Sequence, residues 1–85
     1  HELERHHKRL AEKESEIMIL ADQEFPQEKE LILNTIRAIL VEAIPLEEQL
    51  PEEISVKEKS EILKSYYDRK YAALENLMTQ YIETL

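Results

Sequence analysis

The chain has 85 residues, a formal net charge of −8, no glycine and no cysteine. This length supports one small domain, so we treat residues 1–85 as a single helical unit. Without glycine the chain cannot form the phosphate-binding loops and nucleophile elbows that require this residue. Without cysteine, it cannot form disulfide frameworks, thiolate nucleophiles or zinc ribbons.

The apolar content is sufficient for a folded core. Leu, Ile, Val and Phe make up 24 of the 85 residues, above the fraction of about 20% below which strongly charged chains stay disordered. The longest apolar run, residues 17–21, has five residues, against about 20 for a membrane span. No secretory signal is recognisable. We therefore expect a soluble, cytoplasmic protein without a membrane partner.

Acidic residues are concentrated in the first two thirds of the chain. Residues 1–55 hold 14 acidic and 6 basic residues, whereas residues 56–85 hold 5 of each. A pI of about 4.8 argues against direct nucleic-acid binding, which requires clustered Lys and Arg. The one basic run, residues 5–9, has two interpretations: a contact with nucleic acid or an acidic partner, or a solvated helix face. We favour the solvated face.

The first predicted helix spans about residues 3–24. Leu3, Leu10, Ile17 and Ala21 share one face at helical spacing. Apolar residues are sparse before Ile17, so the early turns can bury only a narrow stripe. Because the chain starts with His1 rather than Met, we expect it to be a piece of a longer protein.

The second predicted helix spans about residues 27–44. Phe25 and Pro26 end the first helix, and Pro45 ends the second. Its apolar residues cover a wide arc, which predicts contacts with more than one neighbour. Leu31 and Val41 lie outside that arc.

A connector of residues 45–54 follows. Leu46, Leu50 and Ile54 recur every four residues, which predicts a short packed helical turn. The connector also carries four glutamates, for which we favour a solvated acidic edge over a contact with a basic partner or weak calcium binding. These are Glu47, Glu48, Glu52 and Glu53.

The third predicted helix spans about residues 55–84, starting at a capping box of Ser55 and Glu58. At 1.5 Å per residue it is about 45 Å long, against about 33 Å and 27 Å for the other two. We expect an all-α three-helix bundle with an overlong third helix. If the second helix packs antiparallel to the start of the third, the end of the third helix extends beyond the second. Its apolar face would then have to be covered by the first helix, a second copy of the chain or another protein.

The third helix supplies all candidate partner-binding residues. Three tyrosines cluster around Lys70, whose stem we expect to lie along them, and these rings suit either core packing or an interface. The candidates are Tyr66, Tyr67, Tyr71, Leu74, Leu77, Met78, Tyr81, Ile82 and Leu85.

No residue is assigned to catalysis, a cofactor or a metal. The pairs Glu2/His6 and Glu4/His7 can each share a helix face, and Glu-x-x-His is a di-iron spacing. A di-iron site would need a dimer to supply the second pair, so we favour a solvated helix end. The chain is therefore not expected to be an enzyme.

The sequence favours a non-catalytic helical module for protein interaction or oligomerisation, with a protein partner or a second copy, most simply a homodimer. The alternative is the dimerisation or effector-binding C-terminal domain of a transcriptional regulator whose DNA-binding part is absent.

Overall fold

The computed structural model describes residues 2–41 and 49–85. In chain order these form α1 (Glu2–Glu24), a 3-10 turn (Pro26–Glu28), α2 (Lys29–Leu40) and α4 (Val56–Glu83). The described residues contain no strand, and α4 is the longest helix with 28 residues. The predicted all-α three-helix bundle with a long third helix is therefore confirmed.

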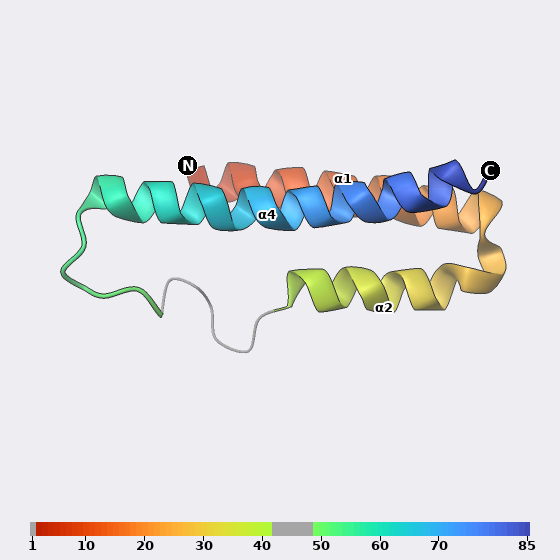
Figure 1. Cartoon of the computed structure of the whole chain (residues 1–85), viewed down its shortest axis with the longest axis horizontal. Helices are drawn as coiled ribbons and strands as arrows, with labels where there is room; N and C mark the ends of the chain where they lie inside the picture. The colour runs from red at the N-terminus through yellow and green to blue at the C-terminus, as the bar shows by residue number, and fades with distance from the viewer. Residues whose placement is uncertain (1, 42–48) are drawn as a thin grey trace.

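The helices α1 and α4 lie side by side and run in the same direction, while α2 runs antiparallel to both (Figure 1). Contacts along the pair occur in the same order in both helices. Arg9 binds Asp68 near the middle, and Phe25 meets Tyr81 at the far end. The result is an elongated molecule of 48 × 21 × 19 Å.

The helix ends follow from local chemistry. The Phe25 N–H donates to Ala21 O at 2.9 Å, which closes α1, and Pro26 then opens the 3-10 turn as a residue that has no N–H to satisfy. At the start of α4, the Ser55 hydroxyl accepts a hydrogen bond from the Glu58 N–H at 3.1 Å. No described residue has a positive φ, so these turns need no glycine.

The core is a single small cluster between the three helices. Its fully buried large side chains are Ile17 from α1, Ile32 and Ile36 from α2, and Leu74 from α4. Leu10 and Ala21 are buried as the α1 stripe predicted, and Leu3 is half-buried. The exposed positions of Leu31 and Val41, at 60% and 70%, agree with their place outside the α2 arc.

The second helix was predicted to continue to residue 44, and this prediction was wrong, because Val41 is already outside the helix. Here α2 ends at Leu40, and Val41 is extended, with φ −85° and ψ 130°. The Lys70 ammonium group donates a hydrogen bond to the Leu40 carbonyl at 2.9 Å. A cation at a helix C-terminus stabilises the carbonyls that have no partner within the helix. The rest of the predicted segment, residues 42–44, lies outside the described residues.

The expected position of the second helix also needs correction. The contact between Leu40 and Lys70 places α2 along the second half of α4, not along its start. The short turn at residues 25–28 holds the start of α2 beside the end of α1, and α1 runs parallel to α4. The end of α4 is consequently packed against both other helices, whereas α2 ends about 21 Å short of the start of α4.

Part of the predicted connector is also visible. Leu46, Glu47 and Glu48 lie outside the described residues. Gln49 is helical, and residues 50–54 form a turn and bends, with Leu50 and Ile54 half-buried and Glu52 and Glu53 exposed. The rest of the predicted helical turn lies outside the described residues. Within the described parts of the chain, no helix is both long and apolar enough to cross a membrane.

Candidate functional site

Eight of the nine candidate residues lie on α4, on the side that the bundle uses for its core, and Leu85 follows two residues after the end of the helix. Their spacing of three and four residues brings them onto one broad face of the helix. The structure divides them into three groups by burial, and these groups have different consequences for binding.

Three of the nine belong to the core of the chain. Leu74 is 0% exposed, Tyr67 7% and Leu77 8%. They pack with side chains of α1 and α2 in the same cluster. These three side chains stabilise the monomer and are not available at its surface.

Tyr66 and Tyr71 are half-buried and lie beside cations. The Arg9 guanidinium carbon is 4.5 Å from the centre of the Tyr71 ring, and Lys13 Nζ is 5.5 Å from it. Lys70 Nζ lies 4.6 Å from the centre of the Tyr66 ring. Cations at these distances are attracted to the ring faces. Both tyrosines therefore already take part in contacts within the chain.

The remaining four residues form a patch at the end of α4, here called the end patch: Met78, Tyr81, Ile82 and Leu85. Met78 and Tyr81 are half-buried and pack against the core, whereas Ile82 is 46% and Leu85 67% exposed. Phe25 meets Tyr81 edge to face, with ring centres 5.1 Å apart. In the end patch, the apolar stripe of α4 therefore continues from the core to the surface.

Polar contacts join α1 to α4. Arg9 Nη2 donates to Asp68 at 2.7 Å, and Lys64 Nζ donates to the other oxygen of the same carboxylate at 2.9 Å. Hydrogen bonds from Lys64 and then from Arg9 lower the pKa of Asp68 to about 2. On α1 itself, a hydrogen bond to Glu16 raises the pKa of Lys13. Sequence spacing could not reveal the contact between Arg9 and Asp68, because these residues are 59 positions apart.

His6 and His7 also face α4 rather than only solvent, whereas His1 lies outside the described residues. His6 stacks on Tyr67 with ring centres 5.1 Å apart, and its Nε2 lies 3.7 Å from Glu2 Oε1, so this pair shares a face as predicted. His7 Nε2 is 3.2 Å from the Tyr67 hydroxyl. Among the described residues, no three His, Cys, Asp or Glu side chains gather in a way that could hold a metal ion.

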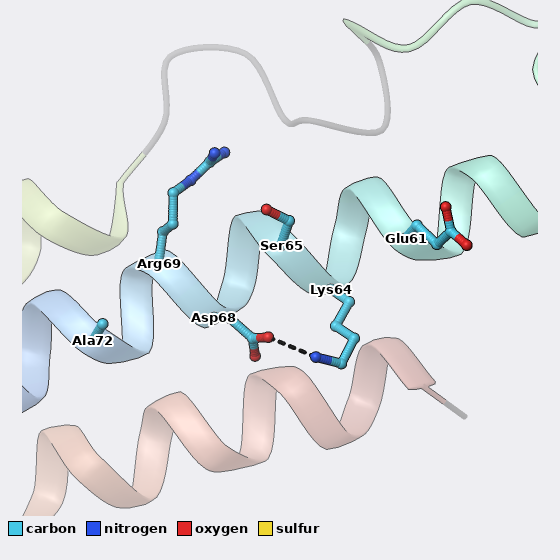
Figure 2. Close-up of a pocket in the computed structure, with 6 residues that line it drawn as sticks. All are labelled: Glu61, Lys64, Ser65, Asp68, Arg69 and Ala72. Carbon is cyan, nitrogen blue, oxygen red and sulfur yellow. Dashed lines mark hydrogen bonds and ion pairs between the residues drawn. The ribbon is translucent and has the colours of Figure 1, made fainter.

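The outer side of α4 carries a shallow hollow of about 390 Å³. Figure 2 shows Lys64 and Asp68 paired on the side toward α1, while Arg69 points away from them. The lining contains one serine but no histidine. It therefore lacks the combination of a hydroxyl nucleophile and a histidine base that is typical of a nucleophilic site. The lining residues are Glu61, Lys64, Ser65, Asp68, Arg69 and Ala72.

Comparison with known proteins assigns no family. No protein-family model, curated protein or solved structure matches the chain. A functional conclusion therefore has to follow from the chemistry of the surface.

Proposed function

We propose that this chain is a non-catalytic helical module that binds another protein or a second copy of itself, and that the end patch is its binding surface. The observation that carries the proposal is the exposure of Ile82 and Leu85 directly beside Met78 and Tyr81. Isolated apolar residues on a surface are ordinary, but here they continue the stripe that builds the core.

The end patch has the composition of a helix-binding surface. The complete burial of one such side chain stabilises a complex by about 1.5 to 3 kcal/mol. Tyr81 combines an apolar ring with a hydroxyl group that can form a hydrogen bond. Methionine adapts its shape to different partners. Because the chain is acidic overall, an apolar helix face flanked by basic residues is the best-matched partner. The cysteine-free sequence favours the cytoplasm as its compartment.

The experiment compares two variants of the full chain. In the double variant Ile82→Glu with Leu85→Glu, charges replace the exposed part of the end patch. The control is Val56→Glu, at a position that is 86% exposed at the other end of α4. Sedimentation velocity over the micromolar range measures self-association, and a photo-crosslinking residue at position 78 reports a different protein partner.

We expect the double variant to lose association or cross-linking, and the control to retain it, with equal helix content by circular dichroism. The proposal is contradicted if the wild-type chain stays monomeric and cross-links to the same proteins as the double variant.

A further inference from the structure

The bundle is polarised in charge along its long axis. Because α1 and α4 run in parallel, both helices end at the same end of the molecule, beside the turn that leads into α2 (Figure 1). Residues 14–30 and 71–85, here called the acidic end, hold eight acidic residues and one basic residue, Lys29. The other described residues hold eight acidic and ten basic residues. The net negative charge of the described chain therefore comes from one end.

The single base of the acidic end already has a partner within the chain. The Lys29 ammonium group donates a hydrogen bond to Asp22 at 2.7 Å. In contrast, Glu24 and Glu83 are both exposed, and neither takes part in the ion pairs of the described residues. The acidic end therefore presents carboxylates that no cation of the described chain neutralises.

These two carboxylates also occupy unfavourable positions in their helices. Glu24 lies in the last turn of α1 and Glu83 in the last turn of α4, and neither turn contains a basic residue. The C-terminus of a helix carries a partial negative charge, which favours cations and disfavours carboxylates. The N-terminus of α2 lies at the same end, but it offsets only one of the two helix C-termini. A cationic partner would supply the charge that both helix ends favour.

The same two carboxylates lie beside the end patch. Glu24 directly precedes Phe25, whose ring meets that of Tyr81 at 5.1 Å. Glu83 directly follows Ile82, which is 46% exposed. An apolar surface and two exposed carboxylates from two different helices are therefore available to the same partner.

We propose that the end patch binds a basic amphipathic helix of another protein and not a second copy of this chain. The inference rests on the proposed function, because it names the partner of the same surface. Apolar side chains of such a helix cover the end patch, while its Lys and Arg residues pair with Glu24 and Glu83 and approach the C-termini of α1 and α4. In a two-fold dimer through the end patch, the acidic ends of both copies would meet and repel each other. Charge therefore decides between the two kinds of partner that an apolar patch alone admits.

The test measures binding of the full chain to a labelled synthetic peptide of leucine and lysine, in which the leucines recur at alternating spacings of three and four. The control peptide has glutamate in place of lysine. Glu24→Lys with Glu83→Lys reverses charges of the acidic end at positions where a helix favours cations. Glu52→Lys with Glu53→Lys is the matched control, because it changes the net charge equally at exposed residues of the connector.

Fluorescence anisotropy gives the dissociation constant, sedimentation velocity the self-association, and circular dichroism the helix content of each variant. We expect the wild-type chain to stay monomeric and to bind the lysine peptide but not the glutamate peptide. The variant at positions 24 and 83 should raise the dissociation constant by at least about tenfold, and the connector variant by less than about threefold. Added salt should weaken the complex, because the charged groups are exposed.

The inference is overturned if the lysine peptide does not bind at high micromolar concentration, if the glutamate peptide binds as tightly, or if both charge variants lose the same affinity. Ile82→Ser with Leu85→Ser separates it from the proposed function, since this change removes apolar surface without adding charge. If the wild-type chain dimerises and this variant does not, the partner is a second copy and the proposed function stands. If this variant binds the lysine peptide as tightly as the wild type, the end patch is not the binding surface and the proposed function fails as well.

Discussion

Replacing Lys70 by methionine tests how the end of α2 is held against α4. Lys70 is only 9% exposed, and its ammonium group donates to the Leu40 carbonyl at 2.9 Å. Methionine keeps an unbranched apolar stem of similar reach but removes the donor and the charge. The variant therefore leaves the last carbonyls of α2 without this partner while changing the packing little.

The expected loss of stability follows from three interactions of the Lys70 ammonium group. A hydrogen bond from a charged donor contributes about 1.5 to 3 kcal/mol, and a cation at a helix C-terminus about 0.3 to 1 kcal/mol. The Tyr66 ring, 4.6 Å from Nζ, adds about 0.5 to 1 kcal/mol. These three contributions overlap, and part of the loss is offset because the variant no longer buries a charged group. We expect Lys70→Met to lower the free energy of unfolding by about 2 kcal/mol, which lowers Tm by roughly 8 to 16 °C in a domain of this size.

Thermal and urea unfolding measure this loss, and Lys64→Met is the matched control on the same helix. Lys64 is 67% exposed and forms a surface ion pair, so its replacement should change stability little. Amide hydrogen exchange supplies a local test, because only Lys70→Met should accelerate exchange in the last turn of α2. A loss below about 0.5 kcal/mol, the range of ordinary surface substitutions, would refute the role given to Lys70.

Three further predictions concern the core, an ion pair and a helix cap. Leu74→Ala removes a side chain that is 0% exposed and should cost about 2 to 5 kcal/mol in urea unfolding, whereas Leu85→Ala should cost almost nothing. The pKa of Asp68 is lowered from 3.8 to about 2, so its carboxylate stabilises the fold above about pH 4 and stops doing so as the pH falls toward 2; Asp68→Asn should remove this part of the dependence of Tm on pH. Ser55→Ala removes the acceptor for the Glu58 N–H and should cost about 1 kcal/mol by thermal unfolding, with faster exchange confined to the first turn of α4.

The sequence alone was sufficient to predict the helices and most of their buried faces. The α1 stripe of Leu10, Ile17 and Ala21 and the cap at Ser55 were predicted because helical periodicity and capping depend on residues within one or two turns of each other. Pro26 marked the boundary between α1 and α2 for the same reason. The nine candidate residues were likewise predicted to share one face of α4, but not how deeply each would be buried.

What the sequence could not determine was the relation between helices, since this depends on contacts between residues far apart in the chain. The carbonyl of Leu40, the last residue of α2, is bound by Lys70, 30 positions later, and no local pattern records that contact. The position of α2 beside the second half of α4 follows from the parallel packing of α1 and α4, which also decides that Tyr67, Leu74 and Leu77 are core residues. Only the tertiary structure could separate these from the exposed Ile82 and Leu85, because periodicity identifies an apolar face but not the neighbour that covers it.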